Sequence, residues 1–591
     1  MSWQKNPFLA LIIILLAFSL PALSSISNVS EGRTNSSGQA VSNAEIAKRI
    51  DEFLTRLQGF SLSGTVLVAK DGQIIFHKGY GSADRSKGIA NNTETVFDIG
   101  SIAKQFTAAA ILKLEMQGKL NTNDPISKYL EDVPTDKQSI TIHQLLGMNS
   151  GVMVSPGPDG TEAMRDREKR VRQLLAAPLN FPPGKRFEYS NGGYNLAAAI
   201  VERVSGQSLQ QFLYEQLFRP AGMTSTGFQV PGFNVPGWES KTVARYYTGN
   251  QDNGHPWAGN SAPWFLKGPG GILSTPADLY KWHQALLGDK ILSAEVKKKL
   301  YTPVVMDYAY GWSVRNSAHG KVIQHDGGTS NGAGNDFIRY LDAGVTITYS
   351  LNNSGEDFLR LVSSNLRALA LGDTVNMPPT LIQLPASALE KYTGKYKLAD
   401  GGDLIVTRDA SGLFVSAGTP EALGLLYNTN SSDKYKDLEA IAVKIAEGVL
   451  KGDHTPLYDA FGGSRPLEQV KTRQQQVWQE RQAQSGQLKG FKVLGTLPGP
   501  EGNMGTVVRY DLERGAIYLQ YMWGRGTLAV IRPLEGPPGL AVLPTSEKEF
   551  VRYDVLSGNV TRVSFNVGAS GRVSDLTIAL RQQQLSAKRA E

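Results

Sequence analysis

The chain of 591 residues contains no cysteine. This absence excludes disulfide bonds, zinc sites with cysteine ligands, a thiol nucleophile and lipidation of an N-terminal cysteine. Histidine is also scarce, and the seven histidines do not have the spacing of metal ligands. We therefore expect a fold that depends on the packing of its cores and that carries no metal and no other cofactor.

A strong excess of one charge is absent as well. The formal net charge is +7, which is small for a chain of this length, so we expect an ordinary soluble surface and no nucleic-acid partner. The most charged segment, residues 164–175, is interpreted as a solvated helix face.

Long apolar segments are limited to the N-terminus. The run Phe8–Leu20 follows Lys5 and precedes Pro21 and several small residues. This layout predicts a secretory signal peptide over residues 1–24 and hence a periplasmic or secreted protein. Because the run is too short to span a bilayer comfortably, an uncleaved anchor is the less favoured alternative, and no further membrane insertion is expected.

The remaining chain divides by composition and periodicity. Residues 25–43 are polar, rich in serine and asparagine, and predict a disordered linker. Residues 44–370 have strand patterns at both ends and helical patterns between, which predicts one mixed sheet built from distant parts of the chain. Prolines and weak periodicity over 371–387 predict a second linker. Residues 388–591 predict a mostly antiparallel β domain with an α+β insertion at about 435–535.

The stretch GSIAKQF places a serine and a lysine three residues apart, ahead of a long apolar run. On a helix this spacing puts both side chains on one face. A serine hydroxyl needs a base to become a nucleophile, and a lysine can be that base when burial keeps it neutral. Ser101 and Lys104 are therefore a candidate nucleophile and general base. Because Ser101 lies at the helix start, its backbone N–H is near the positive end of the helix dipole, where it can stabilise an oxyanion.

The pattern Ser-x-x-Lys is weak on its own, because it occurs three times. Ser2/Lys5 lies in the predicted signal peptide and Ser431/Lys434 in a polar stretch, so both are interpreted as coincidental. Ser330 lies in a Gly-x-Ser-x-Gly pattern, which in hydrolases requires a helix after the serine. Here a strand is predicted to follow, and we reject Ser330 as the nucleophile.

Two further segments carry candidate site residues. Tyr189 and Asn191 precede an apolar helix, where they could relay a proton and hold a substrate amide. His325 and Gly327 lie on one face of a predicted strand, and the glycine lets a substrate approach the backbone. Taken alone, the first pair would more often be a helix-capping turn, and His325 a hydrogen-bonded strand histidine.

These three elements, in this order, resemble the serine β-lactamase and penicillin-binding protein superfamily. Within it, the chain is most similar to class C β-lactamase-like serine hydrolases, which include D,D-peptidases and esterases. The resemblance covers residues 44–368 and includes the stretches SITIHQLLGMNSGV and GPGGILSTPADLYKW. It implies an α/β (α+β) transpeptidase fold, with an antiparallel sheet flanked by helices and a helical subdomain. The domain after residue 387 resembles the lipocalin-like domain of many relatives, for which binding and domain support are open alternatives.

The resemblance also implies roles for the candidate residues. Ser101 would be the acylated nucleophile and Lys104 its general base. Tyr189 would relay a proton to the leaving group and activate water for deacylation. Asn191 would orient the substrate amide or the lysine.

The segment that contains His325 and Gly327 differs from the corresponding segment of many β-lactamases. His325 stands where those enzymes have the lysine of Lys-Thr-Gly, and it is a weaker carboxylate anchor at neutral pH. The oxyanion hole would consist of the backbone N–H groups of Ser101 and Gly328, with Gly327 beside them. The histidine disfavours true β-lactamase activity and leaves the acyl-enzyme mechanism in place.

The sequence therefore predicts an exported serine hydrolase that acts on amide or ester substrates without a cofactor. The expected partner is a small-molecule or peptide substrate. A cell-wall peptide with D-amino acids is favoured over a generic ester, and a β-lactam is third. The alternative from another class is a non-catalytic penicillin-binding or cell-wall-sensing protein. The presence of all three motifs argues against that alternative.

Overall fold

The computed structural model describes residues 41–153, 166–229, 240–256, 263–329, 331–353, 356–399, 401–427, 435–462, 466–498, 503–524, 526–534, 536–554, 558–580 and 583–590. The predicted signal peptide, most of the first linker, Ser330 and the two other Ser-x-x-Lys pairs lie outside these residues. Contacts divide the chain into two compact units, Met1–Met377 and Pro378–Glu591. This division falls within the predicted linker 371–387.

The first unit is built on a six-stranded sheet of order β2-β1-β12-β11-β10-β9. Its strands are β1 (Gly64–Lys70), β2 (Gln73–Tyr80), β9 (Ser313–Ser317), β10 (Gly320–Gly328), β11 (Gly334–Tyr340) and β12 (Val345–Leu351). Every neighbouring pair is antiparallel. Strands from both ends of the unit do share the sheet, but it is not mixed, and the antiparallel sheet implied by the family resemblance is confirmed.

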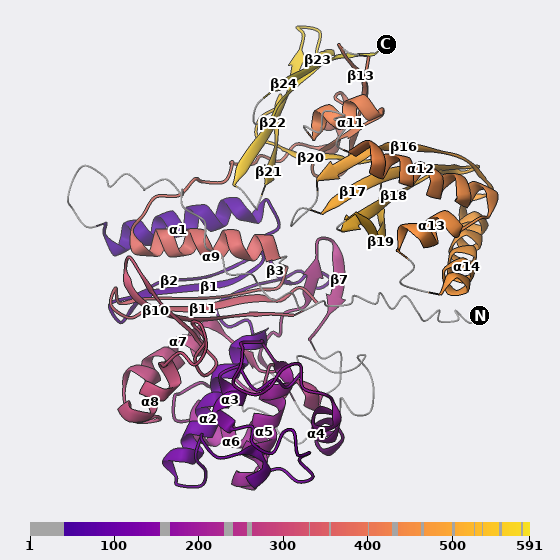
Figure 1. Ribbon diagram of the computed structural model, residues 1–591. Helices are drawn as coiled ribbons and strands as arrows, with labels where there is room; N and C mark the ends of the chain where they lie inside the picture. Colours follow the sequence, from indigo (N-terminus) through magenta and orange to yellow (C-terminus); the bar gives the residue numbers. More distant parts are fainter. Residues whose placement is uncertain are drawn as a thin grey trace, which may run out of the picture. The chain divides into compact units, whose positions relative to one another are not determined.

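Helices cover both faces of this sheet (Figure 1). On one face lie α1 (Asn43–Gln58) and α9 (Glu356–Leu371), side by side. Ser42 caps α1 by accepting the Glu45 N–H at 3.2 Å, and the buried residues of α1 recur at helical spacing. The other face carries a helical subdomain, with α2 (Lys104–Met116), α3 (Ile142–Leu146), α4 (Arg167–Ala176), α5 (Asn191–Ser205), α6 (Leu209–Leu213), α7 (Pro276–Leu287) and α8 (Ala294–Tyr301).

Helix α2 is the centre of the subdomain and is buried on nearly all sides, Lys104 included. Its apolar sequence predicts this burial, and Phe106 packs at 5.1 Å from the rings of both Phe218 and Trp282. Full burial of such a side chain contributes roughly 1.5–3 kcal/mol. A rigid α2 therefore holds the start of the helix, where Ser101 lies, in a fixed place.

The first unit also contains short strand pairs. They are β3 (Ser82–Asp84) with β4 (Ile89–Ala90), β5 (Phe97–Asp98) with β8 (Leu273–Ser274), and β6 (Tyr246–Thr248) with β7 (Gln251–Gly254). The pair β5–β8 matters for the site, because it brings the segment before Ser101 beside the segment that ends at Ser274.

The second unit is a closed antiparallel barrel of eight strands, as the resemblance of this region leads us to expect. The strands are β13 (Gly394–Leu398), β14 (Asp403–Arg408), β15 (Leu413–Ala417), β20 (Gly539–Pro544), β21 (Glu549–Asp554), β22 (Asn559–Val567), β23 (Val573–Ala579) and β24 (Gln584–Arg589). Helix α10 (Ala386–Glu390) precedes the barrel, and α11 (Pro420–Leu426) follows β15. Tyr392, Phe550 and Phe565 pack together in the barrel core, with ring centroids 4.7–5.6 Å apart.

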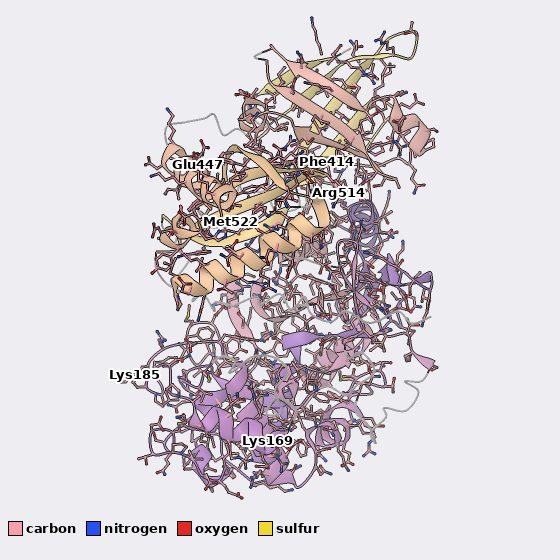
Figure 2. All side chains as sticks on the ribbon, turned by 90° about the vertical axis from the view of Figure 1, so that its right-hand side faces the viewer. Lys169, Lys185, Phe414, Glu447, Arg514 and Met522 are labelled. Carbon is pink, nitrogen blue, oxygen red and sulfur yellow. The ribbon has the colours of Figure 1, made fainter. Side chains whose placement is uncertain are left out.

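An insertion separates β15 from β20, close to the range expected from the sequence. It consists of α12 (Lys436–Lys451), α13 (Thr455–Ala460) and α14 (Leu467–Ser485), followed by a sheet of β16 (Leu488–Pro498), β17 (Met504–Leu512), β18 (Gly515–Gly524) and β19 (Thr527–Leu534). Figure 2 shows its side chains, with Glu447 of α12 and Met522 of β18 labelled. The helices and the sheet enclose an apolar core of their own.

Within the described residues, no helix combines the length and the apolar character needed to cross a bilayer.

Candidate active site

The structure brings Ser101 and Lys104 into contact. Ser101 lies in a 3-10 turn, Gly100–Ala103, and Lys104 is the first residue of α2. Lys104 Nζ lies 3.0 Å from Ser101 Oγ and 2.9 Å from the carbonyl oxygen of Pro269. The lysine side chain is fully buried, and burial lowers its pKa well below the usual value, although the Asp326 carboxylate acts in the opposite direction. A neutral amine at this position can accept the proton of the Ser101 hydroxyl.

Tyr189 lies next to this pair. Its ring centre is 4.7 Å from Lys104 Nζ. Burial raises the pKa of Tyr189, while the Ser101 side chain beside it acts in the opposite direction, and the phenol is protonated at neutral pH. Ser190 fixes the turn, because its hydroxyl accepts the Gly193 N–H at 3.0 Å and thereby caps α5. Tyr189 is thus both near the helix cap and in contact with the candidate nucleophile.

Asn191 lies beside the same site. It is the first residue of α5, and its Oδ1 atom is buried without a hydrogen-bond partner among the described residues. A buried amide oxygen without a partner is unfavourable, so a substrate N–H group can stabilise it. Asn191 and Ser101 line one cavity of about 110 Å³.

His325 is a neighbour of Tyr189. It does not line the cavity beside Ser101. Its ring nitrogens are both engaged, Nε2 with the Tyr308 hydroxyl at 3.1 Å and Nδ1 with the Asp326 backbone oxygen at 2.6 Å. The carbonyl can only accept, so Nδ1 carries the proton and Nε2 accepts from Tyr308. Burial lowers the pKa of His325, and the ring centroids of Tyr189 and His325 are 6.3 Å apart. A neutral histidine here supports the position of Tyr189.

Glycine is required where β10 meets the Ser101 turn. Gly100 has φ +52°, and a Cβ atom there would lie 2.8 Å from the Gly328 nitrogen. A Cβ atom on Gly327 would collide with the carbonyl oxygen of Ile99. The two backbones therefore touch directly, which places the N–H groups of Ser101 and Gly328 beside each other.

The strand ladder shows which way the Gly328 N–H points. Thr329 donates to the Ala333 oxygen at 3.2 Å, so Gly328 and Gly334 form a non-hydrogen-bonded pair and the Gly328 N–H points away from β11. Among the described residues, no acceptor binds the N–H of Ser101 or that of Gly328. Two such donors can stabilise an oxyanion.

Asn335 holds these two backbones together, although no motif in the sequence singles it out. Its Nδ2 atom donates to the backbone oxygens of Asp98 and Gly327, both at 3.0 Å. Asp98 in turn accepts the Gly100 N–H at 2.9 Å, and burial raises the pKa of this carboxyl group to about 6. The strand pattern gave no signal for it, because the buried strand β11 also contains Asp336 and Arg339.

The loop after η6 (Trp264–Leu266) presents the Pro269 oxygen to Lys104 and is fixed by side chains of α2 and α5. Asn195 donates to the carbonyl of Lys267 at 2.9 Å, and Thr107 donates to that of Gly268 at 2.9 Å. Three consecutive carbonyls are therefore held by side chains. This arrangement orients Lys104 toward Ser101.

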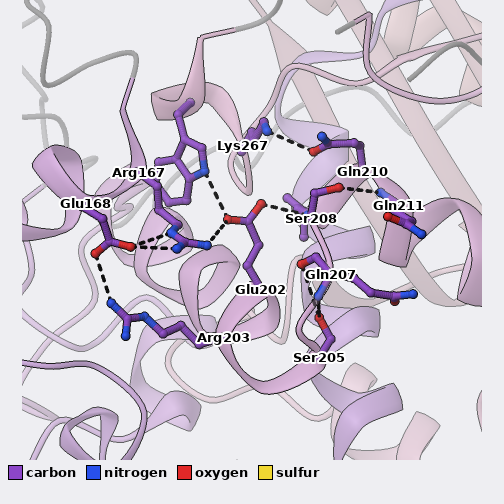
Figure 3. Close-up of polar contacts among 12 residues, drawn as sticks. Arg167, Glu168, Glu202, Arg203, Ser205, Gln207, Ser208, Gln210, Gln211 and Lys267 are labelled. Carbon is purple, nitrogen blue, oxygen red and sulfur yellow. Dashed lines mark hydrogen bonds and ion pairs between the residues drawn. The ribbon is translucent and has the colours of Figure 1, made fainter. Parts of the chain in front are cut away.

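Glu202 anchors the beginning of the same loop (Figure 3). Its carboxylate accepts from Arg167 at 3.1 Å, from the Trp264 indole at 3.4 Å and from the Leu209 N–H at 2.8 Å. Glu202 is only 6% exposed, so this ion pair is screened less than a surface pair. The network fixes the Trp264 end of the loop against α5.

Arg170 corrects one expectation from the sequence. It belongs to the charged segment 164–175, yet it is buried and lines the cavity beside Ser101. Its Nε donates to Asn195 at 3.1 Å, and burial lowers its pKa to about 10. The charge pattern suggested a solvated face because it cannot show that the polar Asn195 of α5 faces Arg170.

In the described part of the chain, no group of acidic and histidine side chains is placed to hold a metal ion.

A Gly100→Ala variant is expected to lower kcat by about 10²-fold, because the added methyl group displaces the Gly328 N–H from the oxyanion position. Steady-state kinetics on a p-nitrophenyl ester measure this effect. Gly118→Ala is the matched control, since Gly118 also has a positive φ, +69°, but open space around it. Gly118→Ala is expected to lose about 1–2 kcal/mol of unfolding free energy through its positive φ, and Gly100→Ala to lose more because its methyl group also meets the Gly328 backbone. Equal activity in the two variants would contradict the assignment of the oxyanion hole.

Comparisons with known proteins show what this chain is similar to. The family model described as Beta-lactamase matches residues 46–371, which contain all the candidate site residues. Penicillin-binding protein 4* of Bacillus subtilis (strain 168) is 26% identical over 462 residues, which cover 71% of this chain and 97% of that protein. The solved structure of an octameric penicillin-binding protein homologue from Pyrococcus abyssi is 18% identical, with a TM-score of 0.51, and covers 91% of this chain and 99% of that one. This last likeness concerns the fold.

Proposed function

This chain belongs to the beta-lactamase family, and from this premise we propose that it is a serine hydrolase that acts through an acyl-enzyme on amide or ester substrates. The observation that carries the proposal is the 3.0 Å contact between the buried Lys104 amine and the Ser101 hydroxyl. Burial keeps the amine neutral, and a neutral amine is the base that a serine nucleophile needs.

Acylation begins when Ser101 Oγ attacks the substrate carbonyl carbon and its proton moves to Lys104 Nζ. The carbonyl oxygen becomes an oxyanion and accepts hydrogen bonds from the N–H groups of Ser101 and Gly328. Loss of one such donor typically costs about 3 kcal/mol of transition-state stabilisation. The Asn191 amide orients the substrate for this attack.

The tetrahedral intermediate then collapses. The bond to the leaving group breaks, and the Tyr189 hydroxyl gives that group a proton, which Tyr189 regains from the Lys104 ammonium. In deacylation the same groups take a proton from water, whose oxygen attacks the acyl carbon. The ester bond to Ser101 breaks, and the serine oxygen recovers its proton.

A peptide that ends in D-amino acids is the proposed substrate class, ahead of a generic ester and of a β-lactam. A relative named as a penicillin-binding protein supports a peptide-like or penicillin-like ligand. His325 in place of a lysine disfavours a true β-lactamase, because a neutral histidine is a poor anchor for a carboxylate. The apolar run Phe8–Leu20 supports a periplasmic or secreted location, where such peptides occur.

The proposal is tested by mass spectrometry after incubation with a labelled penicillin or a fluorophosphonate. We expect an adduct on the peptide that contains Ser101, and turnover of a D-alanyl dipeptide with kcat/KM about tenfold above that of a p-nitrophenyl ester, or 1.4 kcal/mol in the transition state. A higher kcat/KM for the ester would change the proposed substrate class and would leave the proposed serine hydrolase mechanism in place. If neither adduct nor turnover is detected, the chain is a non-catalytic binding protein.

A further inference from the structure

The insertion of the second unit contains a cavity of about 140 Å³, far in sequence from Ser101. Helices α12, α13 and α14 and strands β18 and β19 supply its walls. The apolar lining residues are Ile445, Val449, Leu457, Val477, Leu519 and Ile531. An apolar cavity of about 150 Å³ in another protein binds benzene, so the cavity of the insertion has room for an apolar group about the size of a benzene ring.

Arg481 and Tyr521 bring polar groups to the cavity lining. The Arg481 guanidinium lies 4.9 Å from the centre of the Trp478 ring, which also lines the cavity. The hydroxyls of Tyr521 and Tyr510 form a hydrogen bond with each other. Because this bond uses only one of the two hydroxyl protons, the pair can still donate to a bound oxygen atom.

Arg481 has no acidic partner among the residues that the structure describes. Burial lowers its pKa, and Tyr510 and Tyr521 act in the opposite direction. Arg481 and Tyr521 both line the cavity. The one other polar side chain in the lining is the amide of Gln474. A half-buried cation with neighbouring hydroxyl donors and no carboxylate favours an anionic ligand.

We propose that this cavity binds a small monocarboxylate whose apolar body is about the size of a benzene ring. The planar fork of the guanidinium suits a carboxylate, which it can bind through two parallel hydrogen bonds. The apolar body would lie between α12 and β18, against Ile445 and Leu519. This site is separate from the proposed hydrolase function and does not depend on it.

The test uses the full chain and 4-fluorobenzoate, with binding followed by fluorine NMR. An Arg481→Met variant keeps an apolar stem and removes the charge, and we expect it to weaken 4-fluorobenzoate binding about tenfold. The neutral 4-fluorobenzyl alcohol is expected to bind both proteins within about twofold of each other. Arg473→Met is the matched control, because Arg473 is an exposed arginine of the same helix that does not line the cavity.

A second variant tests the location and is independent of the charge. Val449→Phe adds a ring to the cavity wall, so it is expected to abolish the binding of both probes. Circular dichroism checks that each variant keeps the wild-type fold. The proposal is overturned if 4-fluorobenzoate binds Arg481→Met as tightly as the wild type, if Val449→Phe leaves its binding unchanged, or if the wild type binds neither probe.

Discussion

A Ser101→Ala variant is expected to hydrolyse the preferred substrate about 10⁵-fold more slowly in kcat, because loss of the nucleophile removes the covalent route. The residual rate would come from the two N–H donors, which remain in place and still stabilise an oxyanion. The variant is expected to unfold at the wild-type temperature, since Lys104 keeps its 2.9 Å contact with the Pro269 oxygen. Steady-state kinetics and thermal unfolding measure the two effects.

The control is Ser431→Ala, taken from another Ser-x-x-Lys of the chain. It is expected to keep the wild-type kcat within about twofold, and to keep the penicillin adduct that Ser101→Ala loses. A Ser101→Ala protein that retains more than about a hundredth of the wild-type kcat would show that another group is the nucleophile.

A Lys104→Met variant is expected to lose about 10³-fold in kcat/KM and, at the same time, to become more stable. Activity falls because no neutral amine is left to take the serine proton. Stability rises because a fully buried amine is replaced by an apolar side chain of similar length. Urea unfolding and ester hydrolysis measure the two changes, with the exposed Lys119→Met as control. A Lys104→Met variant that keeps the wild-type activity, whatever its stability, would contradict the role of Lys104 as the base.

The lowered pKa of Lys104 also predicts a pH dependence. The wild-type kcat/KM is expected to rise with pH through the lowered pKa, because only the neutral amine is a base. Between that pKa and the ordinary value of 10.5, the unfolded chain binds a proton that the folded chain does not. The free energy of unfolding therefore rises with pH across this window, and Lys104→Met removes this contribution.

The candidate site was predictable where the geometry is local. Ser101 and Lys104 lie within one helical turn, so their spacing already places them together. Tyr189, Asn191 and Gly328 reach the site only through the tertiary fold. Their position before an apolar helix made Tyr189 and Asn191 candidates, and the family resemblance supplied their roles and Gly328. Arg170 was missed because its partner lies on another helix, and a charge pattern contains no information about that contact.

The fold was predictable to a similar degree. Strand patterns and the break at 371–387 indicated the two units and the insertion. The closed barrel could not be derived from alternation alone, because closure depends on the pairing of β13 with β24, the first and last strands. Likewise, local patterns could not show that β1 pairs with β12 and not with a parallel neighbour.

The pairing of β1 with β12 delays the folding of the first unit. Gly64 opposes Leu351 in this register, so the interior of the sheet joins segments that leave the ribosome far apart in time. Long-range strand pairing is slow, because the entropy of the intervening chain is lost before the contacts form. The chain must therefore be synthesised beyond Leu351 before this register can form.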